Sequence, residues 1–82
     1  MQRYFFHLHQ SGERLKDDEG QLLHDADEAW EAARATARAL MAGDPERTPE
    51  WLASRFEVTD REGAVLLEFP FLEAVEVSGE PN

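Results

Sequence analysis

The chain has 82 residues, of which 18 are acidic and 8 are basic, with a formal net charge of −10 and no cysteine. This length corresponds to one small domain, and the lack of cysteine excludes disulfides, thiolate metal sites and cysteine nucleophiles. The acidic balance argues against a protein that binds a phosphate backbone or an anionic membrane surface, because both need basic patches.

The N-terminal ten residues and the charge distribution bear on location and partners. The start of the chain has one arginine and no long apolar run, so we expect no signal peptide, no membrane association and a cytoplasmic location. Residues 57–82 hold seven acids and one base, a net charge of −6, against −4 for residues 1–56. Such an excess serves solubility first, and it also suits a basic protein partner.

The first elements are predicted to be extended. Residues 3–9, RYFFHLH, alternate with period two and are rich in aromatic side chains, which predicts a strand. Short extended segments are expected at 14–16 and 21–23. The turn between them, 17–20, ends at Gly20, which can adopt a positive φ.

One main helix is predicted over residues 26–42. Asp25 is a suitable N-cap, and Glu28 three residues later completes a capping-box pattern. Gly43 ends the helix. Its contact face is mostly alanine, which lets the helix lie close to a sheet, and comprises Ala26, Ala29, Trp30, Ala33, Ala37, Leu40 and Met41.

The second half of the chain reads as a stiff connection and a hairpin. In residues 43–54, Thr48 is the expected N-cap of a short turn whose Trp51 and Leu52 close one end of the core. Residues 55–71 are predicted to form a hairpin around a turn at 60–63, with Val65 on the same face as Leu67. Residues 71–77 fit either a short helix or an edge segment.

These elements predict an α+β fold. We expect an antiparallel sheet of three to four strands packed on one main helix, in the order ββαββ. Residues 1–77 would form the single domain and residues 78–82 a frayed tail.

The face of the sheet opposite the helix is the predicted partner-binding surface. Phe5 and Leu66 would be exposed apolar side chains among polar ones, which indicates self-association or binding to a protein partner. The favoured interpretation is therefore a small acidic interaction module, with a homodimer as one form. Its predicted site residues are Phe5, His7, His9, Glu57, Leu66 and Glu68.

Two alternatives stay open. His7 and His9 share a strand face and could bind a metal or act in catalysis if a neighbouring strand supplied a third ligand. Alternatively, carboxylates in a stripe could mimic nucleic acid and inhibit a DNA-binding protein. The chain has no nucleophile elbow, phosphate loop, zinc-protease helix or calcium loop, so we predict no enzymatic activity and no cofactor.

Several of these segments together resemble a known family. The opening RYFFHLH, the DDEG turn, the alanine-rich helix and FEVTDREGAVLLEFPF are similar to a family of short bacterial proteins, common in alphaproteobacteria, that is classed as a domain of unknown function. The resemblance covers about residues 3–77, and its most specific parts are Y-F-F-H and V-T-D-x-x-G…P-F. Residues 44–53 are less typical. The resemblance implies a small α/β domain in the cytoplasm with an unassigned role, and it brings no catalytic residues or cofactor with it.

Overall fold

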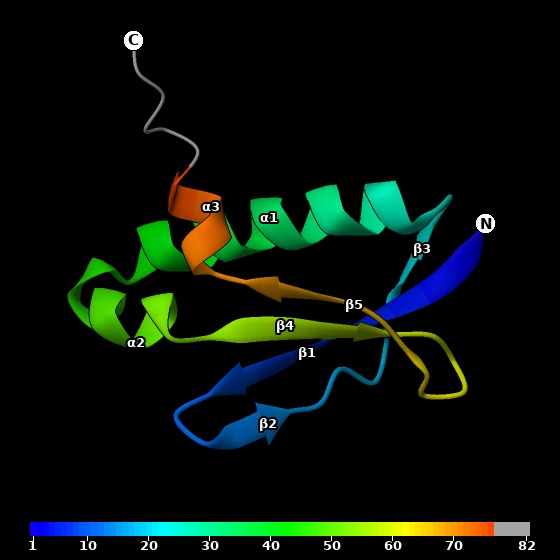
Figure 1. The fold of residues 1–82 in the computed structure, drawn as a ribbon, viewed down its shortest axis with the longest axis horizontal. Coiled ribbons are helices and arrows are strands. Elements are labelled where there is room, and N and C mark those ends of the chain that lie inside the picture. The colour runs from blue at the N-terminus through cyan, green and yellow to red at the C-terminus, as the bar shows by residue number, and fades with distance from the viewer. Residues whose placement is uncertain (77–82) are drawn as a thin grey trace, which may run out of the picture.

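The computed structural model describes residues 1–76, which form a sheet with helices on one side (Figure 1). The strands are β1 (Gln2–Gln10), β2 (Glu13–Leu15), β3 (Gln21–Leu23), β4 (Arg55–Thr59) and β5 (Val65–Pro70). The helical elements are α1 (Ala26–Gly43), the 3-10 turn η1 (Pro45–Arg47), α2 (Thr48–Leu52) and α3 (Leu72–Glu76). The predicted α+β fold is confirmed. The predicted tail, 78–82, lies outside the described residues, as does residue 77.

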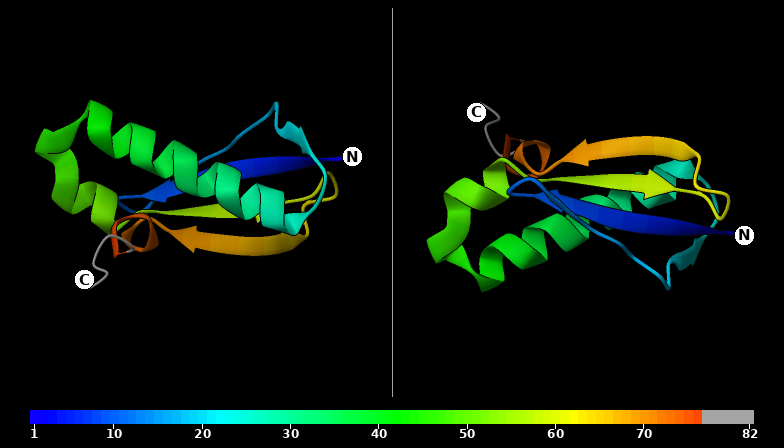
Figure 2. Two further views of the ribbon diagram at one scale, coloured as in Figure 1. Left: turned by 90° about the horizontal axis from the view of Figure 1, so that it is seen from above. Right: turned by 90° about the horizontal axis from the view of Figure 1, so that it is seen from below.

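The sheet is antiparallel throughout, with the order β2-β1-β4-β5. The long strand β1 is paired at its C-terminal end with β2 and at its N-terminal end with β3. Figure 2 shows both short strands on the border of β1 that faces away from β4. The sheet therefore has five strands, because the short segment 21–23 pairs with β1.

The hairpin of β4 and β5 contains a one-residue irregularity. Val58 pairs with Leu67, but Thr59 pairs with Val65, so Leu66 is the extra residue of a β-bulge. The expectation that Val65 shares a face with Leu67 is wrong, because the bulge turns Val65 to the side of Thr59. Val65 is consequently 51% exposed.

The main helix packs as its alanine stripe predicts. Ala29, Ala33 and Ala37 are completely buried against the sheet, whereas the predicted member Ala26 is exposed. Such small side chains bring the helix axis close to the strands, and Figure 2 shows α1 lying obliquely across one face of the sheet. Trp30 extends this contact, with its ring edge-on to Phe69 at 5.2 Å between centroids.

The ends of the helices follow local side-chain chemistry. Asp25 caps α1 by accepting a hydrogen bond from the Glu28 amide at 2.9 Å, as predicted. The Glu28 carboxylate accepts from the His24 amide at 2.7 Å, one residue earlier than in a standard capping box. Thr48 is the first residue of α2 and not its N-cap, since its hydroxyl donates to the Pro45 carbonyl.

The aromatic side chain of α2 closes one end of the core, as expected. Trp51 is 7% exposed, and its ring stacks on that of Phe71 at 5.8 Å between centroids. Its indole N–H donates to the Asp44 carbonyl. After Phe71 the chain forms α3, which resolves the open alternative for residues 71–76 in favour of a helix.

Replacing Gly20 by Ala should destabilise the fold more than replacing Gly12 by Ala. Both glycines have a positive φ, which costs an alanine about 1–2 kcal/mol. At Gly20 a Cβ would also lie 2.8 Å from Cγ of Arg3 and 2.9 Å from the backbone oxygen of Tyr4, whereas at Gly12 it would meet nothing. We expect the difference between the two variants to exceed about 1 kcal/mol in urea denaturation. Equal losses would contradict the close approach of the loop to β1.

Candidate functional site

The open face of the sheet, the side of β1 and β4 turned away from α1, brings most of the predicted site residues together. The strand register places Phe5 opposite Thr59 and His7 opposite Glu57. Glu68 of β5 lies on the other side of Glu57. Leu66, in the bulge, is 41% exposed at the outer border. His9 follows His7 on the same face, so the predicted grouping comes from three neighbouring strands.

The structure corrects the expectation that His7 lies on an open surface. His7 is 4% exposed, because the loop 16–20 between β2 and β3 folds over it. The Asp17 amide donates to its Nδ1 at 3.0 Å. Since an amide N–H only donates, Nδ1 is the acceptor, and Nε2 carries the proton that it donates to the Thr59 hydroxyl oxygen at 3.0 Å. His7 is thus held neutral, in one tautomer.

The environment of His7 favours this neutral form. Burial lowers the pKa of His7 below its ordinary value of 6.5, and the nearby Arg14 guanidinium lowers it further. Glu57 and Asp17 act in the opposite direction without reversing the shift. Protonation at Nδ1 would also break the bond from the Asp17 amide, so an acidified His7 is incompatible with the closed loop.

The Asp17 carboxylate holds the loop against β1. Its Oδ2 accepts from the Phe6 amide at 3.0 Å, and its Oδ1 accepts from the amides of Glu19 and Gly20 at 3.0 and 3.1 Å. Burial raises the pKa of Asp17, but the three amide hydrogen bonds outweigh burial and leave the pKa below its usual value. From the sequence, Asp17 is recognisable only as a turn residue, since its hydrogen bond with the Phe6 amide joins residues that no local pattern links.

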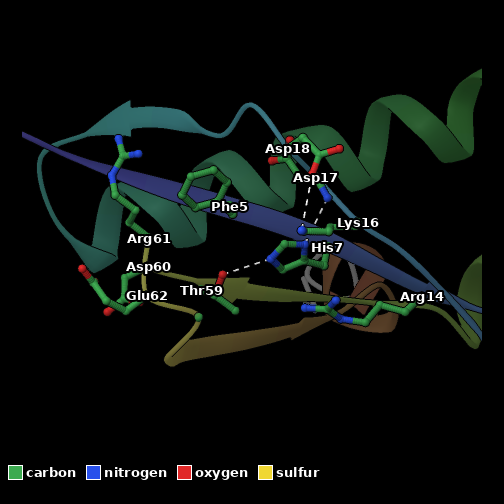
Figure 3. A pocket seen from close by; sticks show the side chains of 11 residues that line it. Phe5, His7, Arg14, Lys16, Asp17, Asp18, Thr59, Asp60, Arg61 and Glu62 are labelled. Carbon is green, nitrogen blue, oxygen red and sulfur yellow. Dashed lines mark hydrogen bonds and ion pairs between the residues drawn. The ribbon is translucent and has the colours of Figure 1, made fainter.

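A hollow of about 350 Å³ lies on the open face above His7 (Figure 3). The Phe5 and His7 rings contribute two nearly parallel surfaces, with an interplanar angle of 8° and 6.4 Å between centroids. The charged side chains around it have mixed sign and are Arg14, Lys16, Arg61, Asp17, Asp18, Asp60 and Glu62. We refer to this feature as the His7 hollow. An aromatic surface within a charged rim can accept an apolar or planar group of a ligand.

His9 belongs to a separate cluster beside the His7 hollow. Glu57 Oε1 accepts from Arg14 Nε at 2.9 Å and lies 2.9 Å from His9 Nε2. These hydrogen bonds, first that of His9 and then that of Arg14, hold the pKa of Glu57 at about 2. The two histidines therefore have different partners. Within residues 1–76, no three histidine or acidic side chains come together as a metal site would require.

Comparison with known proteins identifies a family. The family described as a domain of unknown function (DUF6894) matches residues 3–72, which confirms the resemblance at the level of such a domain. No curated protein and no solved structure matches the chain. None of the helices within residues 1–76 has both the length and the apolar character needed to cross a membrane.

Replacing Asp17 by Asn should lower the free energy of unfolding by about 1–3 kcal/mol, because the amide nitrogen cannot accept and leaves a backbone donor unpaired. Asp18 is the matched control, since its side chain is 78% exposed and pairs with Lys16 at 3.6 Å. Asp18→Asn should change stability by less than about 0.5 kcal/mol. Urea denaturation at neutral pH measures both variants, and similar losses would show that Asp17 has no special role in the loop.

Stability should fall on mild acidification through His7. Because the folded-state pKa of His7 is below 6.5, the unfolded chain takes up the proton first. Neutral His7 makes its full contribution to the free energy of unfolding at pH values above 6.5. This contribution is lost as the pH falls from 6.5 towards the folded-state pKa. Urea midpoints at about pH 7.5 and about pH 5.5 measure this loss.

His7→Gln should reduce the change in midpoint between the two pH values, whatever its effect on stability at neutral pH. His24→Gln is the control, because the His24 side chain is 67% exposed. This variant should keep the pH dependence of the wild type. If both variants retained the full dependence, His7 would not be its source.

Proposed function

We propose that this chain, which belongs to the family described as a domain of unknown function (DUF6894), is a small acidic module that binds a protein partner through the open face of its sheet. The observation that carries the proposal is the His7 hollow, which lies on the face that α1 leaves uncovered. Phe5 is half-buried in this hollow, and partly exposed aromatic surface within a polar rim is typical of interaction sites.

The hollow is preorganised for binding. The Asp17 carboxylate secures the loop, and the loop in turn secures His7, whose other nitrogen is bonded to Thr59 on β4. A partner would not have to order these groups, which lowers the entropic cost of association. The parallel Phe5 ring would then provide the main apolar contact for a partner side chain.

The charges favour binding over catalysis. Both ring nitrogens of His7 are engaged in hydrogen bonds, and Glu57 is held ionised between His9 and Arg14. These groups support a rigid, non-enzymatic surface whose rim contributes specificity. The net charge of −10 would speed association with a basic partner, and the absence of cysteine is consistent with the proposed cytoplasmic location.

Phe5→Ser should weaken partner capture about ten-fold, while Leu15→Ser should leave it unchanged. Leu15 is 51% exposed on β2, and its register partner Leu8 belongs to the side of the sheet that packs on the core. The tagged full chain and both variants, matched for folding by circular dichroism, would be incubated with lysate at low and high salt. A partner that survives high salt and is lost only in Phe5→Ser supports the proposal.

Two outcomes would contradict it. Equal capture of the partner by the wild type and Phe5→Ser would show that the open face is not the binding surface. Recovery of basic DNA-binding proteins at low salt alone, with equal yield from every variant, would favour nucleic-acid mimicry instead.

A further inference from the structure

The β5–α3 border consists of β5, the outermost strand at one border of the sheet, and the α3 helix that follows it. β5 is the last strand in the sheet order, and within residues 1–76 no strand pairs with its outer side. Both views in Figure 2 show β5 along this border. The opposite border consists of two three-residue strands, β2 and β3. Short strands protect an edge from pairing, whereas a longer edge can accept another strand.

Large apolar side chains concentrate along this border. Seven large hydrophobic residues in the described part of the chain are exposed, and four of them belong to β5 or α3. These four are between 41% and 53% exposed and are Val65, Leu66, Leu72 and Val75. Pro70 limits the usable strand at its C-terminal end, because it has no amide proton to donate. The border therefore offers a short strand flanked by apolar surface.

The charge of the same region indicates what kind of chain would pair there. Glu68 and Glu73 are exposed on β5 and α3, and neither element contains a basic residue. Arg55 of the neighbouring strand contacts Glu68 at 3.5 Å, which offsets only one of these acids. Two copies of this border would repel each other, whereas a positively charged segment would be attracted.

We propose that the β5–α3 border binds an extended, positively charged segment of a partner protein by adding it to the sheet as a further strand. This inference rests on the proposed function and specifies how a partner docks. Backbone hydrogen bonds to β5 would hold the segment in place. Its alternate side chains would contact Val65 and Leu66 on one side and approach the carboxylate of Glu68.

A short blocked peptide of alternating Lys and Val tests the inference on the full chain. We expect saturable binding that weakens at high salt, with slower hydrogen exchange of the β5 amides in the complex. The matched peptide of alternating Glu and Val should not bind. Leu66→Lys should weaken binding of the Lys peptide about ten-fold or more, because it places a positive charge on the border that repels the positively charged peptide. Leu15→Lys, which places the same charge on β2, should not.

Several results would overturn the inference. These are no saturable binding of the Lys peptide, binding without slower exchange at β5, or equal effects of the two lysine variants. Concentration-dependent doubling of the mass with protection of β5 in the absence of peptide would identify a second copy as the occupant. A further outcome is a lysate protein that is captured equally by the wild type and Leu66→Lys but not by Phe5→Ser. That result would overturn this inference and leave the proposed function intact.

Discussion

The Asp17 carboxylate fills the gap in the sheet between β2 and β3. These two strands pair with opposite ends of β1 and leave the Phe6 amide between them without a backbone partner on that border. Asp17 accepts this amide and two amides of its own loop, which brings the loop close to β1 and buries His7 beneath it. Gly20 is required at the closest approach, where a side chain would meet the Tyr4 carbonyl. The loop that this carboxylate holds in place contributes Lys16, Asp17 and Asp18 to the lining of the His7 hollow.

The histidines illustrate how a suggestive pair of residues can serve structure. His7 and His9 share a strand face, as metal ligands would. However, His7 forms hydrogen bonds with Thr59 and Asp17, whereas His9 forms one with Glu57. A buried neutral imidazole that donates on one side and accepts on the other links a loop to β4 with little electrostatic cost. The open face is therefore divided into a charged cluster around Glu57 and the adjoining hollow.

Most of the fold could be predicted, and the reason is that its signals are local. The alanine stripe of α1, the Asp25 cap and the alternation of β1 each depend on residues within a few positions of one another. The site was predictable only as a set of residues on one face. The burial of His7 could not be predicted, because its hydrogen-bond partner Thr59 is 52 residues away. The loop that covers His7 also has a conformation that depends on its contacts with β1.

By itself, the sequence determined the α+β class, the position of the main helix, the shared face of Phe5, His7 and His9, and the strongly acidic character. These features follow from periodicity, capping and composition, which are properties of short segments or of the whole chain. Only the tertiary structure decided that 21–23 completes the sheet, that Val65 faces outward and that a hollow forms over His7. These features depend on strand order and on a one-residue bulge, and a shift of one residue reverses the face of every side chain that follows.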